Sequence, residues 1–119
     1  MNGYLKLARN VSQYSTYKYR VGAVIAKKKP VSVGFNIVKS HPMYSNNLRT
    51  TVHAEMNAIL NSDCENLIGA TIFVFRADRN GFPAIARPCE DCLKTLKKYG
   101  IKKMTYSINE YPYYRTERI

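Results

Sequence analysis

The chain has 119 residues, of which 45% are hydrophobic and 23% are charged, and this ordinary mixture excludes collagen-like, disulfide-rich and disordered proteins. A chain of this length usually forms one compact core, so we expect residues 1–119 to be a single domain. It carries 19 Lys and Arg against 8 Asp and Glu, a formal net charge of +11, which makes polyanions plausible partners.

The first half of the chain predicts one helix and two short strands. Apolar residues at three-residue spacing predict a helix over residues 4–14. Two apolar, β-branched runs predict strands over 21–26 and 31–35, and the basic stretch 27–30 between them predicts a hairpin turn. Residues 36–51 have no sustained periodicity and are expected to form an exposed loop.

The second half predicts alternating helices and strands. Residues 52–61 form a helical pattern, and the continuous apolar run at 70–75 is typical of a central strand covered on both faces. A loop is expected over 76–87. A second amphipathic helix is expected over 89–99, with Gly100 as its C-terminal stop.

A last strand is predicted over 102–107, and the polar, Tyr-rich residues 108–119 are expected to form a tail. The strands before and after the second amphipathic helix should be parallel, because a crossover helix joins them. The order of elements therefore predicts an α/β fold with a mixed sheet between helices.

Charge and hydropathy indicate where such a protein works and what it contacts. Residues 1–50 carry nine Lys and Arg and no acidic residue, with five tyrosines among them: Tyr4, Tyr14, Tyr17, Tyr19 and Tyr44. This pattern is typical either of a solvated basic face or of contact with a nucleotide or nucleic acid. No apolar run is long enough for a membrane span and the N-terminus lacks a secretory signal, so we expect a cytoplasmic protein without a membrane partner.

Two short motifs carry the chemistry: His53-Ala54-Glu55 and Pro88-Cys89-Glu90-Asp91-Cys92, each at the start of a predicted helix. Together they offer one imidazole and two thiolates, enough for a tetrahedral zinc site with a fourth position open to water. Helix N-termini favour the thiolate form of cysteine. Glu55 would lie beside the metal without binding it, where a carboxylate can carry a proton from water to a substrate.

Three other interpretations of these residues stay open. Cys89 and Cys92 resemble a redox couple, although this leaves His53 and Glu55 unexplained. A closed structural zinc site would need a fourth ligand, from Cys64 or His41. Alternatively, His53 is an ordinary core histidine.

The two motifs resemble the H-x-E…P-C-x-x-C signature of the zinc-dependent cytidine and deoxycytidylate deaminase superfamily. The resemblance extends to Val21–Ile25 and Gly34-Phe35-Asn36 and implies a cytidine deaminase-like three-layer α/β/α fold. It implies one catalytic zinc ion, assembly into a dimer or tetramer, and these roles: zinc ligands His53, Cys89 and Cys92, proton shuttle Glu55, substrate contacts Asn36 and the backbone N–H of Ala54.

The function implied is hydrolytic deamination of a cytosine base to uracil, with a cytidine or deoxycytidine nucleotide as the expected substrate. Two alternatives remain: cytosine, or less readily adenine, in single-stranded DNA or RNA, and a non-enzymatic nucleic-acid-binding module with structural zinc. The sequence departs from the family pattern at Arg87, which precedes Pro88 where many relatives have Ser or Glu. It also ends soon after the last predicted strand, so we expect a truncated C-terminus without a complete fifth strand.

Overall fold

The computed structural model describes residues 3–15, 19–38, 51–63 and 67–119. Its helices and strands follow the order α1 (Gly3–Ser12), β1 (Arg20–Ala26), β2 (Pro30–Phe35), β3 (Ile37–Val38), β4 (Thr51–Val52), α2 (Ala54–Leu60), β5 (Thr71–Ala77), β6 (Pro83–Ala84), α3 (Glu90–Lys98), β7 (Lys103–Ser107) and β8 (Tyr114–Arg118). The predicted helices and the four predicted strands are confirmed to within a few residues at their ends.

A six-stranded mixed sheet forms the centre of the fold, in the order β2-β1-β5-β7-β8, with β6 pairing β5. Strand β1 is antiparallel to both β2 and β5. Strands β5 and β7 are parallel, as their crossover through α3 predicts. Strands β3 and β4 form a separate two-stranded sheet.

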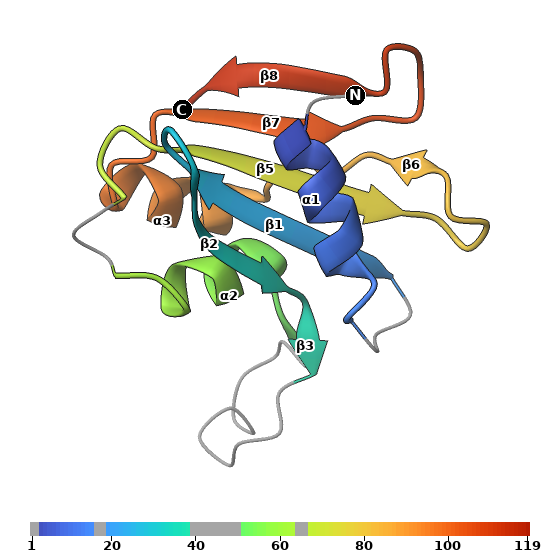
Figure 1. Cartoon of the computed structure of the whole chain (residues 1–119), viewed down its shortest axis with the longest axis horizontal. Helices are drawn as coiled ribbons and strands as arrows, with labels where there is room; N and C mark the ends of the chain where they lie inside the picture. Colours follow the sequence, from blue (N-terminus) through green and yellow to red (C-terminus); the bar gives the residue numbers. More distant parts are fainter. Residues whose placement is uncertain (1–2, 16–18, 39–50, 64–66) are drawn as a thin grey trace.

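The sheet buries both of its faces, which gives three layers. Along β1, Ala23 and Ile25 point into one apolar cluster while Val24 and Ala26 point into the other, as the two-residue period of a strand requires. One cluster includes residues of α2 and α3, and the other includes residues of α1. Figure 1 shows α1 lying across β1 and β5 in front of the sheet, with α2 and α3 behind it. The expected α/β/α architecture is confirmed.

Two glycines set how closely the helices approach the sheet. A Cβ at Gly22 would lie 2.0 Å from the carbonyl oxygen of Ala8 in α1. A Cβ at Gly34 would lie 2.3 Å from the backbone nitrogen of Ala58 in α2. Because real Cβ atoms do not approach backbone this closely, only glycine at these positions lets α1 and α2 pack where they do.

Helix α3 ends as the sequence predicts. Gly100 has a positive φ of 83°, its N–H donates to the carbonyl of Lys97, and the N–H of Ile101 donates to the carbonyl of Leu96. These two bonds form a Schellman motif, in which glycine relieves the strain of the left-handed residue. The motif directs the chain into β7.

Three expectations for irregular segments are wrong in part. The expected loop over 76–87 includes the end of β5 and the short strand β6. Residues 108–119 are not a polar tail, because Tyr114–Arg118 form β8, an antiparallel fifth strand along β7. The expected loop over 36–51 contains strand β3 and the first residue of β4, while its residues 39–50 lie outside the described part of the chain. No helix within the described ranges is long and apolar enough to cross a membrane.

Candidate metal centre and cavity

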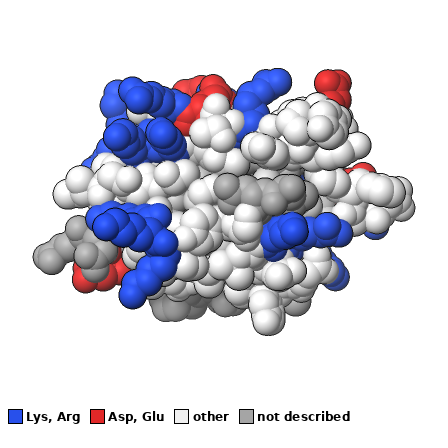
Figure 2. Space-filling view, turned by 45° about the horizontal axis from the view of Figure 1, so that its top comes forward, with Lys and Arg blue, Asp and Glu red and all other residues white. Residues whose placement is uncertain are grey.

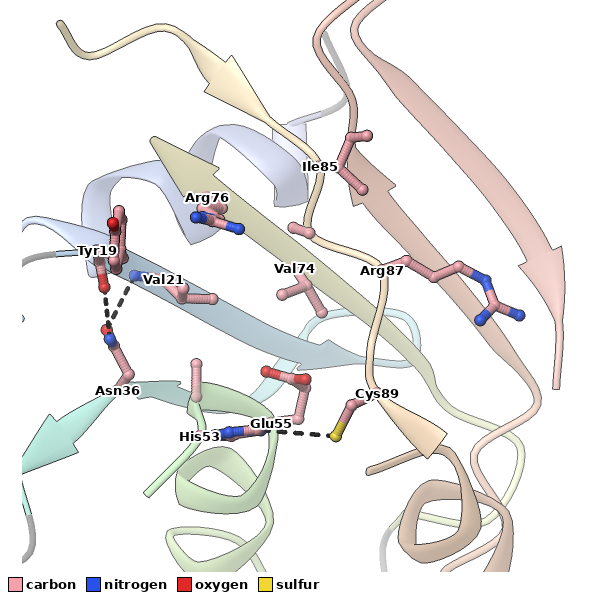
Figure 3. A pocket seen from close by; sticks show the side chains of 12 residues that line it. Tyr19, Val21, Asn36, His53, Glu55, Val74, Arg76, Ile85, Arg87 and Cys89 are labelled. Carbon is pink, nitrogen blue, oxygen red and sulfur yellow. Dashed lines mark hydrogen bonds between the residues drawn. The ribbon is translucent and has the colours of Figure 1, made fainter. Parts of the chain in front are cut away.

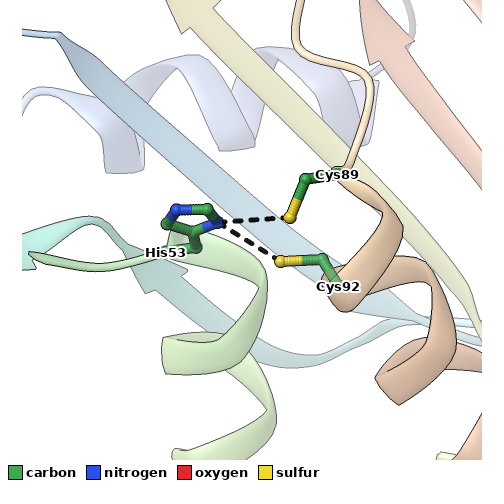
Figure 4. A group of neighbouring side chains, drawn as sticks. All are labelled: His53, Cys89 and Cys92. Atoms are coloured by element: carbon green, nitrogen blue, oxygen red, sulfur yellow. Dashed lines mark hydrogen bonds between the residues drawn. The ribbon is translucent and has the colours of Figure 1, made fainter. Parts of the chain in front are cut away.

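Three possible metal ligands meet where α2 and α3 begin. His53 is the N-cap residue of α2, Cys89 is the N-cap residue of α3, and Cys92 lies in the first turn of α3. The Nδ1 atom of His53 lies 3.4 Å from Sγ of Cys92 and 3.7 Å from Sγ of Cys89. Figure 4 shows both sulfur atoms facing the same edge of the imidazole ring.

These distances fit one tetrahedral zinc ion. Ordinary Zn–N and Zn–S bond lengths of about 2.1 and 2.3 Å at tetrahedral angles place nitrogen and sulfur about 3.6 Å apart. The two nitrogen–sulfur distances lie on either side of this value, and all three ligand atoms lie within 4.8 Å of one another. Among the described residues, this is the one cluster of His, Cys, Asp or Glu that could hold a metal ion.

Glu55 lies beside this cluster, with 5% of its surface exposed. Burial raises the pKa of its carboxyl group above the ordinary value, and a backbone hydrogen bond, the charge of His53 and the Cys92 thiol oppose that rise. A carboxyl group whose pKa is raised above its ordinary value holds a proton more readily, which suits a group that accepts a proton and returns it.

Cys92 lies at the buried side of the cluster. Burial above all, followed by the charge of Glu55 and the neighbouring Cys89, raises the pKa of its thiol in the metal-free protein. A bound cation has the opposite effect, because it coordinates the thiolate and displaces the proton. Metal binding to this site should therefore release protons.

A cavity of about 290 Å³ opens over the cluster (Figure 3). Its walls come from the start of β1, the end of β2, the start of α2, the end of β5 and the segment before α3. The lining residues are Tyr19, Val21, Asn36, His53, Ala54, Glu55, Val74, Arg76, Ile85, Ala86, Arg87 and Cys89. The structure thus brings every predicted site residue except Cys92 to the cavity wall, and Cys92 joins the site through its contact with His53.

Asn36 is buried in the cavity wall, and its side chain already makes two hydrogen bonds. Its amide nitrogen donates to the carbonyl of Tyr19, and its amide oxygen accepts a 2.9 Å bond from the N–H of Val21. The side chain therefore fixes the strand entry at Tyr19 to Val21. Ala54 is buried at the first position of α2, where a backbone N–H has no partner within the helix.

Three of the polar or charged residues that line the cavity do not belong to the predicted site: Tyr19, Arg76 and Arg87. The sequence shows Tyr19 only as one of five tyrosines among cations, predicts Arg76 at the start of a loop, and marks Arg87 only as a departure from the family pattern. Arg76 instead belongs to β5, and its guanidinium carbon lies 4.9 Å from the centre of the Tyr19 ring. The Arg87 guanidinium pairs with Glu117 at 3.0 Å. Neither contact is visible in the sequence, because each joins residues far apart in the chain.

The structure argues against a redox couple and against a core histidine, but it does not describe the residues that would close a structural zinc site. Cys89 and Cys92 are both free cysteines, and their contact with His53 accounts for the histidine that a redox couple leaves unexplained. His53 is only half-buried and faces the sulfur atoms, so it is not an ordinary core histidine. His41 and Cys64, the possible fourth ligands, lie outside the described residues.

Much of the positive charge lies away from the cavity. The exposed Lys27, Lys28 and Lys29 follow the end of β1. Lys103 and Arg118 lie opposite each other in the β7–β8 ladder, at the same end of the sheet. Figure 2 shows Lys and Arg gathered mainly on its left side, which in Figure 1 carries the β1–β2 turn and the C-terminus. The cavity is built instead from the start of β1 and the end of β5.

Comparison with known proteins identifies what this site resembles. The model of the cytidine and deoxycytidylate deaminase zinc-binding region matches residues 1–108. A deoxycytidylate deaminase from Mycobacterium phage D29 is 40% identical over 55 residues, which are 46% of this chain and 35% of that protein. The match therefore spans about a third of the length of this curated relative.

Solved structures of similar fold include the dCMP deaminase of cyanophage S-TIM5, with 27% identity, a TM-score of 0.69, and coverage of 91% of this chain and 86% of that one. A second structure of that enzyme, in complex with dCMP and dUMP, matches with 26% identity and a TM-score of 0.68 over 91% of this chain and 84% of that one. The cytidine deaminase of Burkholderia pseudomallei shares the fold at 17% identity, with a TM-score of 0.70 over 99% of this chain and 93% of that one. The donor set and the family match together identify a site for one zinc ion.

Proposed function

The chain belongs to the cytidine and deoxycytidylate deaminase family, and from this premise we propose that it deaminates the cytosine base of a cytidine or deoxycytidine nucleotide to uracil by hydrolysis. The observation that carries the proposal is the opening of the His53, Cys89 and Cys92 cluster onto a cavity that also contains the buried Glu55. A structural zinc site needs no cavity and no spare carboxylate beside it. The similarity to a cyanophage dCMP deaminase supports a nucleotide as the substrate.

His53, Cys89 and Cys92 would hold the zinc ion, and two of them, His53 and Cys89, line the cavity. Zinc bound there would supply Lewis acidity that lowers the pKa of water to about 7. Glu55 would accept the proton that water loses as its oxygen attacks C4 of cytosine. It would then return this proton to the amino group, so that water and cytosine become uracil and ammonia.

The remaining wall would orient the base. The backbone N–H of Ala54 would donate to the base carbonyl, since it lies at the first turn of α2 beside Glu55. Asn36 would contact the sugar or base with the amide hydrogen that it does not donate to Tyr19. Because Asn36 is itself held by two backbone bonds, it needs little reordering when substrate binds.

A substrate panel tests the proposal. Purified, zinc-loaded protein is incubated with CMP, dCMP, cytidine, deoxycytidine and single-stranded and duplex oligonucleotides, and ammonia release is measured. We expect turnover of at least one cytosine mononucleotide and its loss after chelation of zinc. Absence of turnover on every cytosine substrate by zinc-loaded, folded protein would overturn the proposal.

Cytosine in a single-stranded polynucleotide is the second candidate substrate. The basic, acid-free first half of the chain favours it, because phosphate neutralisation drives such binding. Deamination of oligonucleotides should then fall steeply with salt concentration. Turnover of mononucleotides alone, with little salt dependence, would remove this candidate.

A non-enzymatic module with structural zinc would require a fourth protein ligand. His41→Ala and Cys64→Ser should each retain the zinc ion if the site is catalytic, because neither residue belongs to the proposed ligand set. Loss of zinc from either variant would indicate a closed site.

We further propose that residues 1–119 form one deaminase domain and that this domain assembles as a dimer or tetramer. Sedimentation equilibrium measures the number of chains in the assembly.

A further inference from the structure

Two arginines line the cavity, and their surroundings differ. The side chain of Arg87 is 44% exposed and its guanidinium pairs with Glu117. In Figure 3 it points away from the cavity. Arg76 extends from β5 on the cavity side and lies against the ring of Tyr19.

The strand period explains why Arg76 faces the cavity. Val74 and Arg76 are two residues apart on β5 and therefore point to the same face of the sheet. Val74 belongs to the apolar cluster on the face of α2 and α3, where the metal ligands lie, and it lines the same cavity. Phe73 and Phe75 point to the opposite face, into the cluster beneath α1.

A chain of contacts holds Arg76 in place. Val21 pairs with Arg76 across the β1–β5 ladder, and Asn36 bonds to the backbone of both Val21 and Tyr19. The bond from Asn36 holds the backbone of Tyr19, and the ring of Tyr19 makes a cation–π contact with the Arg76 guanidinium that does not neutralise its charge. The guanidinium of Arg76 therefore lies in the cavity wall beside the Tyr19 ring.

The charges of the two arginines are balanced differently. Glu117 neutralises Arg87, whereas no carboxylate within the described ranges forms an ion pair with Arg76. The one acidic residue in the cavity lining, Glu55, lies with His53 and Cys89 at the end of the cavity away from Arg76 and Tyr19 (Figure 3). The Arg76 end of the cavity therefore carries an uncompensated positive charge.

We propose that Arg76 binds the phosphate group of the substrate and makes the enzyme selective for cytosine nucleoside monophosphates over the free nucleosides. This inference rests on the proposed function, because it places the cytosine ring at the zinc ligands and the phosphate at the opposite end of the cavity. Guanidinium groups match phosphate oxygens in charge and geometry. Tyr19 acts as a positioning residue.

The test compares kcat/KM for dCMP and deoxycytidine in the zinc-loaded wild type and in Arg76→Gln. A charge-assisted hydrogen bond of ordinary strength predicts a loss of about 10- to 100-fold for dCMP. The value for deoxycytidine should change little, so the preference for the monophosphate should collapse. Arg76→Lys should recover part of it, because lysine keeps the charge but not the planar fork.

Two matched variants distinguish phosphate binding by Arg76 from the effect of removing any positive charge. Arg79→Ala removes the same charge from an exposed turn, and Arg87→Ala removes the neutralised arginine. Both should keep the wild-type preference. A binding titration of dCMP and deoxycytidine to Glu55→Gln, with and without Arg76→Gln, measures the same preference without turnover.

The outcomes distinguish the inference from the proposed function. Wild-type protein that deaminates deoxycytidine as well as dCMP would overturn the inference and leave the function intact. So would an Arg76→Gln variant that loses both activities equally, or an Arg87→Ala variant that alone loses the preference. Wild-type protein inactive on every cytosine substrate would overturn the function itself.

Discussion

On both faces of the sheet a helix packs close to a glycine, but one face is an apolar core and the other contains the metal site. On each face a glycine in a strand admits a helix at close range, Gly22 for α1 and Gly34 for α2. The α1 face is filled with apolar side chains, and no residue of its apolar cluster lines the cavity. The α2 and α3 face contains the metal ligands and Glu55. Alternation along the same strands thus supplies packing on one side and chemistry on the other.

The largest effect should follow from removing a thiol on the chemical face. Cys92→Ser should reduce bound zinc from one ion per chain to a small fraction and abolish turnover, because serine is a poor zinc ligand. The melting temperature should fall toward that of chelated wild type, since a ligand that binds the native state stabilises it. Metal analysis and a thermal scan measure both effects. Full zinc content with full activity in this variant would contradict the ligand set.

Glu55→Gln should separate catalysis from metal binding. We expect turnover to fall about 10²- to 10⁴-fold, the usual contribution of a general acid–base group, with zinc content unchanged. Its counterpart on the other face is Leu5→Ala, which should destabilise the protein by about 2–5 kcal/mol and leave the turnover of folded enzyme unchanged. Wild-type turnover in Glu55→Gln would remove its assigned role.

The two glycines provide the closest test of the comparison. Gly22→Ala and Gly34→Ala should each destabilise the protein by about 1–3 kcal/mol through overpacking, measured by urea unfolding. Only Gly34→Ala should also lower kcat, because displacement of α2 moves His53 and Glu55 relative to α3. Equal kcat values in the two folded variants would show that the position of α2 is not critical.

The smallest effect should be a change with pH in the stability that Glu117, the partner of Arg87, contributes. Hydrogen bonds from Tyr106 and Arg87 lower the pKa of Glu117 below its ordinary value near 4.5. A carboxylate with a lowered folded-state pKa stabilises the protein above its unfolded pKa, and this contribution disappears as pH falls through the folded value. The wild type should therefore melt slightly above Glu117→Gln at neutral pH and level with it in strong acid. A constant difference at every pH would contradict this linkage.

The sequence predicted the metal cluster because its ligands occur in two short motifs at helix starts, where local spacing determines geometry. The central strand β5 was predictable from its continuous apolar run. Strand β8 was not, since its side chains are polar and mostly exposed. Its pairing depends on the backbone ladder to β7 and on contacts such as Thr105 with Thr116, which no local pattern reveals.

The Arg76 end of the cavity could not be predicted from the sequence for a related reason. Arg76 follows the apolar run of β5, so local composition predicted that the strand had already ended. Its role depends on Tyr19 across the β1–β5 pair and on Asn36 beyond it. Such long-range contacts appear only when the strand register is known.

The position of the metal ligands also affects how the protein matures. His53 and Cys89 are separated by 36 residues, a segment that includes all of β5. An ion held by both would close this loop much as a disulfide does, but reversibly and without an oxidant. The supply of zinc would then govern both how many chains are able to catalyse and how long they resist unfolding and degradation.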